Sequence, residues 1–252
     1  MNNIRLLLEY DGSKFHGWQK QPHLRTIQAE LEKVINLVTG SKIRALTASG
    51  RTDAGVHAKG QACNFLIDGE VDLQRLKNSV SSLMKGELSV LSAEYIDKDF
   101  NACRDAVCKQ YTYTILNRQS PAVLDYGRVW HIAGDLNVEL MSIEAQRLAG
   151  VHDFKSFQAS GCAAKTSIKE IISSQLKCEP PYIRYVVVGR GFLKQMVRNI
   201  VGTLVAFSQG KLEDKNIIAL LERCDRRYAG PTAPAHALCL DWVRYDDEES
   251  LS

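Results

Sequence analysis

The sequence lacks the patterns that mark membrane, secreted and metal-binding proteins. No stretch reaches about 18 uncharged apolar residues, so no membrane-spanning helix is expected. The histidines include no His-Glu-x-x-His pattern, and we therefore expect no catalytic metal ion. The cysteines are odd in number and have no Cys-x-x-Cys spacing, which favours reduced thiols over a disulfide framework; they are Cys63, Cys103, Cys108, Cys162, Cys178, Cys224 and Cys239.

Nucleotide-binding glycine motifs, short repeats and low-complexity tracts are also missing. Gly189 and Gly191 have no third glycine at the spacing of a dinucleotide fingerprint, and no glycine-rich loop has the Gly-Lys-Ser/Thr ending of a P-loop. The chain from Met1 enters an apolar segment that carries Glu9 and Asp11, unlike a signal peptide, so we expect a cytoplasmic protein. A net charge of +3 neither requires nor excludes a polyanionic partner.

The composition that remains is that of an ordinary folded protein. Of 252 residues, 45% are hydrophobic and 24% are charged, so the chain has the material for a substantial core. This length allows one large domain or two domains of about 100 to 150 residues. We do not expect disorder.

The first half of the chain alternates strands and helices. Apolar alternation predicts strands at 4–10, 42–47, 61–67 and 88–96. Thr26 is placed to cap a helix that ends at Gly40, and Asp72 is placed to cap a second helix. The order strand, helix, strand, strand, helix, strand is that of a ferredoxin-like α+β unit.

The second half shows a comparable order of elements. A β-branched and aromatic strand at 111–116 puts Tyr111 and Tyr113 on one face. The other predicted elements are helices at 138–148, 192–205 and from Asp214, and strands at 167–177, 182–188 and 238–245.

These patterns predict an α+β fold built from two similar ferredoxin-like α/β domains. The predicted N-terminal domain is 1–105, the C-terminal domain is 106–246, and an acidic tail follows at 247–252. We expect the domains to share one extended, mainly antiparallel sheet, with an active-site cleft between them.

Residues 48–58, Ala-Ser-Gly-Arg-Thr-Asp-Ala-Gly-Val-His-Ala, are the candidate site for chemistry. The segment lies between two predicted strands, and it places Asp53 two positions after Arg51 and four before His57. Cationic neighbours would keep such a carboxylate ionised. On these residues alone, a turn capped by Asp53 beside a solvated Arg51 is an equally ordinary interpretation.

Residues 13–21 interleave aromatic side chains with cations. Phe15 and Trp18 lie among Lys14, His16 and Lys20, and exposed rings beside ammonium groups suit a nucleic-acid surface. An ordinary exposed loop is the alternative.

The undecapeptide at 48–58 resembles the signature of the TruA family of tRNA pseudouridine synthases. Tyr-Asp-Gly-Ser-Lys at 10–14 and Gly-Trp-Gln at 17–19 are similar to the N-terminal strand and loop of that family, and the likeness extends over nearly the whole chain. The resemblance implies isomerisation of uridine to pseudouridine in the anticodon arm of tRNA, at positions 38, 39 and 40. It also implies a homodimer. No electrons change hands and no group is lost in this reaction, so we expect no cofactor.

The resemblance assigns roles to individual residues. It implies that Asp53 is the catalytic aspartate, acting either as nucleophile at the sugar C1′ or as base at C2′. Arg51 would contact the target phosphate or fill the gap left by the flipped base. Tyr111 would stack on the uracil, although a strand tyrosine packed in the core is the ordinary alternative.

Arg198 and Leu238 complete the site that the resemblance implies. Arg198 lies among apolar residues, where a guanidinium is costly to bury without an anion, and Asp53 is the expected partner. A surface arginine on the polar side of a helix is the alternative. Leu238 would line the uracil pocket. Candidate backbone contacts to RNA are Lys14, Lys20, Arg25, Lys109, Arg118, Lys165 and Lys194.

The chain departs from the family pattern at several positions. Asn101 and Cys103 replace the usual His and Arg, and Ala237 stands where the family has Gly. Two other classes stay open. A non-catalytic RNA-binding protein would tolerate a change at Asp53. A glycoside or nucleoside hydrolase would need a second acid, and the sequence offers no clear candidate.

Overall fold

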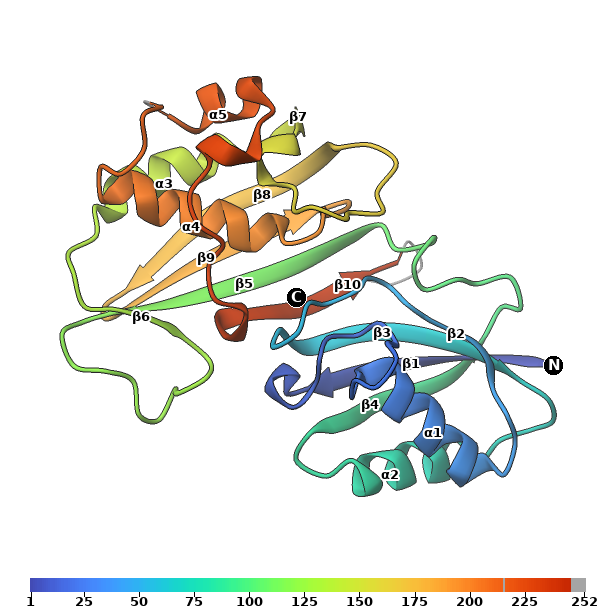
Figure 1. Cartoon of the computed structure of the whole chain (residues 1–252). Helices are drawn as coiled ribbons and strands as arrows, with labels where there is room; N and C mark the ends of the chain where they lie inside the picture. Colours follow the sequence, from blue (N-terminus) through green and yellow to red (C-terminus); the bar gives the residue numbers. More distant parts are fainter. Residues whose placement is uncertain (215, 246–252) are drawn as a thin grey trace. The chain divides into compact units, whose positions relative to one another are not determined.

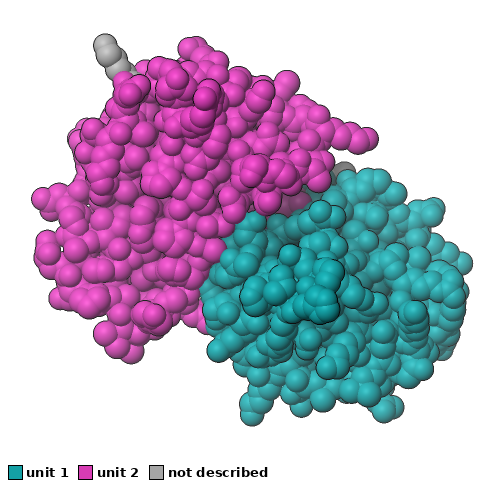
Figure 2. Space-filling model, viewed as in Figure 1, with its two compact units in different colours: residues 1–107, 239–252 teal, residues 108–238 magenta. Residues whose placement is uncertain are grey.

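The computed structural model describes residues 1–214 and 216–245, which divide into two compact units (Figure 2). Unit 1 consists of Met1–Val107 with Cys239–Ser252, and unit 2 of Cys108–Leu238. The described residues form ten strands and five α-helices, so the predicted α+β class is confirmed (Figure 1). The predicted acidic tail at 247–252 lies outside the described residues.

Unit 1 follows the predicted order strand, helix, strand, strand, helix, strand, and gains one strand from late in the chain. Its elements are β1 (Asn2–Tyr10), α1 (Ile27–Thr39), β2 (Arg44–Ala48), β3 (His57–Ile67), α2 (Leu73–Leu83), β4 (Leu88–Ile96) and β10 (Leu238–Arg244), with the 3₁₀ turn η1 (Gly12–Lys14). β1 is antiparallel to both β3 and β4. β2 pairs with β3 between Cys63 and Leu66, whereas β10 pairs in parallel at His57 and Ala58.

β10 differs from the predicted division of the chain, which put residues 106–246 in one domain. Its backbone pairs with β3 through Cys239↔His57 and Leu240↔Ala58. The N–H of Val107 also donates to the carbonyl oxygen of Arg244 (2.9 Å). An alternating pattern identifies a strand but not its partner, and here the last strand clusters with unit 1.

The helices of unit 1 begin where the sequence predicts. The Thr26 hydroxyl accepts from the N–H of Ala29, and the Asp72 carboxylate accepts from the N–H of Arg75, as N-caps do. α1 ends at Gly40, whose φ of 67° is in the left-handed region. Both helices bury one apolar face, consisting of Ile27, Leu31 and Ile35 in α1 and of Leu76 and Val80 in α2.

Unit 2 is an antiparallel set of strands covered by helices. Its elements are β5 (Cys108–Asn117), β6 (Trp130–Ile132), α3 (Val138–Gln146), β7 (Gly150–Asp153), β8 (Ile168–Glu179), β9 (Tyr182–Gly189), α4 (Met196–Ser208) and α5 (Ile217–Arg223), with the 3₁₀ turns η2 (Lys155–Phe157), η3 (Arg226–Tyr228) and η4 (Ala235–Ala237). The strand order is β5-β9-β8-β7, and β6 runs parallel to β5. Among the described residues, no helix combines the length and apolar character needed to cross a membrane.

α4 starts later than the predicted helix at 192–205. Gln195 has a φ of 59°, which is incompatible with a right-handed helix, so the helix begins at Met196. α4 contacts β5 and α3, and most of its side chains are buried. The helix is therefore a core element of unit 2 that carries Arg198.

Candidate active site

The loop at 49–56 connects β2 and β3, and its backbone is packed closely against the turn that follows β1. A Cβ on Gly12 would lie 2.0 Å from the carbonyl oxygen of Val56, and one on Gly17 would lie 2.9 Å from that of Thr52. Gly17 also has a φ of 84°. The N–H of Trp18 donates to the Thr52 carbonyl (3.0 Å). Only glycine permits this approach, so the early glycines hold the loop in place.

Buried polar side chains hold the base of the loop. The hydroxyls of Tyr10 and Thr52 are hydrogen-bonded (2.8 Å), and burial raises the pKa of Tyr10 well above its ordinary value. The amide of Gln61 donates to the carbonyl oxygen of Gly50 (2.8 Å) and bonds the hydroxyl of Ser49. A satisfied buried network of this kind restricts the loop to one conformation.

The predicted strand at 61–67 is four residues longer in the structure, because β3 begins at His57. This histidine is buried, and its Nδ1 accepts from the N–H of Gly12 (3.2 Å) and lies 3.2 Å from Asp11 Oδ1. These two contacts join the ring of His57 to the residues that directly follow β1. His57 therefore anchors the turn after β1, a role that the sequence did not indicate.

Asp53 and Arg51 share this held loop. Asp53 is half-buried, and Arg51 is exposed. The carbonyl oxygen of Asp53 accepts from the N–H of Val56 (3.1 Å), closing a turn in which Gly55 has a φ of 83°. The loop thus presents a carboxylate on a rigid backbone two residues from a guanidinium. This arrangement suits general-base or nucleophilic chemistry on a substrate of complementary shape.

The prediction that the aromatic rings at 13–21 form an exposed nucleic-acid surface is wrong. Phe15 and Trp18 are only 4% and 2% exposed, so neither can stack on a base from solvent. Trp18 packs near Tyr10, with ring centroids 6.3 Å apart. The guanidinium of Arg25 lies over Phe15 at 4.8 Å. Both rings therefore belong to the hydrophobic core.

Several candidate RNA contacts are engaged within the protein. Arg25 makes a two-pronged contact with Glu87 (2.9 and 2.6 Å), which lowers the pKa of that carboxyl. Lys20 pairs with Glu32, and the side chain of Lys194 donates to the carbonyl oxygen of Ser160. Arg118 donates to the carbonyls of Ser120 and Pro121. These contacts give the cations a role in the protein itself, while phosphate contact by any of them stays a prediction.

Arg25 and Lys14 are expected to differ in the salt dependence of binding to tRNA, the partner that the resemblance at 48–58 implies. Lys14 is exposed on the same segment, whereas the Arg25 guanidinium is held by Glu87 and Phe15. Lys14→Ala should reduce the slope of log affinity against log salt concentration by about 0.7, and Arg25→Ala should leave it nearly unchanged. Binding of labelled tRNA measured across a salt series checks this. An equal loss of slope in both variants would contradict it.

Tyr111 lies on β5 and is 8% exposed. Its ring meets Phe192 edge-on, with centroids 5.1 Å apart. Tyr111 and Tyr113 are both buried and are two residues apart on one strand, so the predicted shared face is confirmed. β5 contacts α4, the helix that carries Arg198. Stacking of Tyr111 on a uracil stays a prediction.

Arg198 is half-buried on α4, and the segment at 230–234 receives its side chain. Its Nε donates to the carbonyl oxygen of Ala233 (2.8 Å), and the N–H of Ala233 donates back to the carbonyl of Arg198 (3.2 Å). The guanidinium plane is therefore oriented by backbone. Pairing of Arg198 with Asp53 stays a prediction.

Leu238 is buried at the start of β10, directly after η4. The replacement of the family's Gly by Ala237 is accommodated, because Ala237 has no positive φ and belongs to that 3₁₀ turn. His236 contacts the carbonyl of Val129 (3.1 Å). The backbone here does not require glycine.

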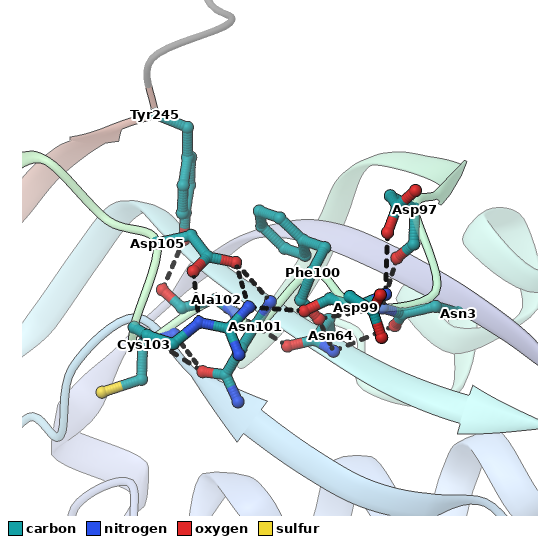
Figure 3. Close-up of polar contacts among 11 residues, drawn as sticks. Asn3, Asn64, Asp97, Asp99, Phe100, Asn101, Ala102, Cys103, Asp105 and Tyr245 are labelled. Carbon is teal, nitrogen blue, oxygen red and sulfur yellow. Dashed lines mark hydrogen bonds and ion pairs between the residues drawn. The ribbon is translucent and has the colours of Figure 1, made fainter.

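Asn101 and Cys103 lie in a turn before β5 (Figure 3). Asn101 Oδ1 accepts from the N–H of both Cys103 and Arg104 (3.0 Å each), so Asn101 forms the turn. The N–H of Ala102 donates to the side chain of Asn64 on β3 (2.9 Å). The exposed Cys103 side chain points away from this network. Asn101, which departs from the family pattern, therefore stabilises this turn.

Sequence reasoning missed the residues that support the site. Gln61 and Asn199 belong to no motif, and no sequence signal assigned a supporting role to Thr52 within the 48–58 segment or to Tyr113 on β5. Asn199 is fully buried and bonds both Phe157 and Thr232. The available signal was a polar residue within a mostly apolar helical segment. Within the described residues, no three His, Cys, Asp or Glu side chains are grouped as a metal site would require.

An α+β chain with a carboxylate on a backbone-locked loop fits a class of RNA-modifying isomerases. The model of the tRNA pseudouridine synthase family matches residues 7–103 and 145–246, and the chain belongs to this family, whose members isomerise uridine to pseudouridine in tRNA. A protein of Acetivibrio thermocellus named tRNA pseudouridine synthase A is 38% identical over 245 residues, covering 97% of this chain and 100% of the relative.

Two further relatives carry the same name. The protein of Geotalea daltonii is 40% identical over 245 residues, covering 97% of this chain and all of its own length. That of Geobacter sp. strain M21 is 40% identical over 248 residues, covering 98% of this chain and all of its own length. The family resemblance inferred from residues 48–58 is confirmed.

Proposed function

We propose that this protein converts uridine to pseudouridine at positions 38, 39 and 40 in the anticodon arm of tRNA, without a cofactor, using Asp53. The observation that carries the proposal is the Asp53 loop. Its backbone is fixed by Trp18 and by the polar side chains beneath it, and its half-buried carboxylate follows Arg51 by two residues. A preorganised anion is what glycosidic bond cleavage at a ribose needs.

The reaction rearranges bonds within one nucleotide. The bond between uracil N1 and ribose C1′ breaks, the base turns, and a bond forms between C5 and C1′. The C5 proton is lost and N1 gains one, so atoms and electrons balance without a redox partner. Asp53 acts in one of two ways, by attacking C1′ to give a glycosyl ester or by taking the C2′ proton to give a glycal.

The other site residues have supporting roles in the proposal. Arg51 contacts the target phosphate or fills the gap left by the extruded base. Tyr111 stacks on the uracil, and Leu238 lines the base pocket. Arg198 pairs with Asp53, and such a guanidinium favours the charged, reactive carboxylate. The two units, as similar α+β domains on a shared sheet, would each contribute residues to one active-site cleft.

The proposed partner is tRNA, and the proposed assembly is a homodimer in the cytoplasm. One chain carries a net charge of only +3, which is a limited attraction for an RNA with dozens of phosphates. Two copies would double the basic surface available to one tRNA.

Tritium release tests the proposal. The intact protein is incubated with tRNA carrying tritium at uridine C5, alongside transcripts in which uridines 38, 39 and 40 are replaced by cytidine. We expect tritium in water and pseudouridine in the digest from the first RNA, and neither from the fully replaced one. Release from the replaced RNA would overturn the positional assignment.

The same assay separates the two other classes. Free uracil in place of pseudouridine would identify a hydrolase, and a hydrolase would ordinarily need a second carboxylic acid. Tight tRNA binding without tritium release would identify a non-catalytic RNA-binding protein.

A further inference from the structure

The segment at 230–234, called here the strap, is held to unit 2 by both of its last two carbonyl groups. The Ala233 carbonyl accepts from Arg198 Nε on α4 (2.8 Å). The next carbonyl, that of Pro234, accepts from the hydroxyl of Tyr113 on β5 (2.9 Å). The strap is therefore hydrogen-bonded both to a helix and to a strand of unit 2.

Tyr113 is suited to a fixed donor role. The residue is fully buried, and its ring packs edge-on against Trp130 with centroids 6.2 Å apart. Burial raises the pKa of Tyr113, so the hydroxyl keeps its proton, while the charge of Arg198 acts weakly in the opposite direction. Tyr113 therefore donates to the carbonyl directly after the one that Arg198 bonds.

The strap is also anchored along the rest of its length. Its first part is bonded to α4, through the Gly230 N–H to Thr203 (3.0 Å) and the Thr232 hydroxyl to Asn199 (2.7 Å). Pro234 has no N–H, so its carbonyl is its one backbone hydrogen-bonding group. η4 and Leu238 follow at once. The Tyr113 contact therefore holds the strap at the point where it leads into η4 and Leu238.

We infer that Tyr113 is a positioning residue for the isomerisation, because its hydroxyl fixes the strap that orients the Arg198 guanidinium and leads to Leu238. The inference rests on the proposed function of Arg198. Losing one hydrogen bond leaves the side chains present but lets the guanidinium tilt. Small displacements of a charged group at a reacting centre reduce the rate far more than they reduce substrate binding.

The test compares two single-atom deletions. Tyr113→Phe removes the strap contact and keeps the ring. Tyr185→Phe is the matched control, because Tyr185 is the cross-strand neighbour of Tyr113 and is also buried. Its hydroxyl is hydrogen-bonded to that of Ser174 (2.9 Å) and not to the strap. We expect Tyr113→Phe to lower the single-turnover rate of tritium release about tenfold with tRNA affinity within about twofold. Tyr185→Phe should keep the wild-type rate, although its melting temperature should fall by about as much as that of Tyr113→Phe.

A double-mutant cycle with Arg198→Lys tests the route. Lysine has no guanidinium Nε to donate to the Ala233 carbonyl. We therefore expect Tyr113→Phe to add little to the loss of rate caused by Arg198→Lys. Three outcomes would overturn the inference while the proposed function stands. They are a wild-type rate in Tyr113→Phe, an equal loss of rate in Tyr185→Phe, and a double variant whose loss is the full product of the Tyr113→Phe and Arg198→Lys losses. A wild-type rate in Arg198→Lys would instead overturn the proposed role of Arg198, and the inference with it.

Discussion

Asp53→Asn is expected to lower the rate of pseudouridine formation at least about 10⁴-fold. Asparagine has nearly the same size, and the backbone carbonyl of Asp53 accepts the hydrogen bond that closes the turn, so the loop should persist. The amide cannot attack C1′ or accept the C2′ proton. Single-turnover tritium release from tRNA labelled at uridine C5 measures the loss.

Binding and folding serve as controls for this variant. Removing an anion should leave tRNA affinity unchanged or slightly higher, because phosphate is negative. Asp68→Asn makes the same change of charge in unit 1, at an exposed side chain that pairs with Arg44 at 3.4 Å, and should keep the full rate. Asp53→Asn activity within tenfold of wild type would remove the aspartate from the mechanism.

The two routes for Asp53 differ at the sugar. Abstraction of the C2′ proton breaks a carbon–hydrogen bond, so deuterium at C2′ should slow that route by a primary isotope effect. Attack at C1′ leaves the C2′ bond intact and predicts only a small effect. Measured on the intact protein, the effect assigns the role of the carboxylate.

Gly202→Ala is expected to destabilise the protein by on the order of 3 kcal/mol, despite the better helix propensity of alanine. A Cβ on Gly202 would lie 1.7 Å from the carbonyl oxygen of Pro231, a backbone atom that cannot rotate away. α4 and the strap would have to separate. Because Arg198 Nε rests on Ala233 of the strap, activity should fall with stability. Urea unfolding measures the first effect, and tritium release the second.

Gly134→Ala is the matched control in unit 2. A Cβ there meets nothing within 4 Å, and its φ is not positive, so the same substitution should change stability by less than about 1 kcal/mol. If Gly202→Ala were as stable as Gly134→Ala, the close approach of α4 to the strap would not be a constraint in solution.

Local signals predicted local structure well. Thr26 and Asp72 cap their helices because a side-chain oxygen within three residues of an unpaired N–H needs no tertiary partner. The same reasoning failed at the start of α4. The positive φ of Gln195 is unusual for a residue with a side chain, and nothing in the local sequence marks it.

Side-chain exposure was predicted less well. Phe15 and Trp18 lie between cations in the sequence, a pattern shared by RNA-binding surfaces and by short segments that fold over a core. Their burial follows from contacts with Tyr10 and Arg25, which are set by how the turn folds back onto β1. Alternation of residue types cannot distinguish these outcomes.

The sequence by itself determined the family, the class of fold and the candidates for chemistry, because residues 48–58 and the periodicity of the strands and helices are properties of short stretches. Only the tertiary structure decided that β10 pairs with β3, that glycines at 12 and 17 hold the Asp53 loop, and that Tyr113 and Arg198 meet neighbouring carbonyls of one strap. These contacts join residues far apart in the chain. Their geometry depends on packing of whole elements, which no local pattern encodes.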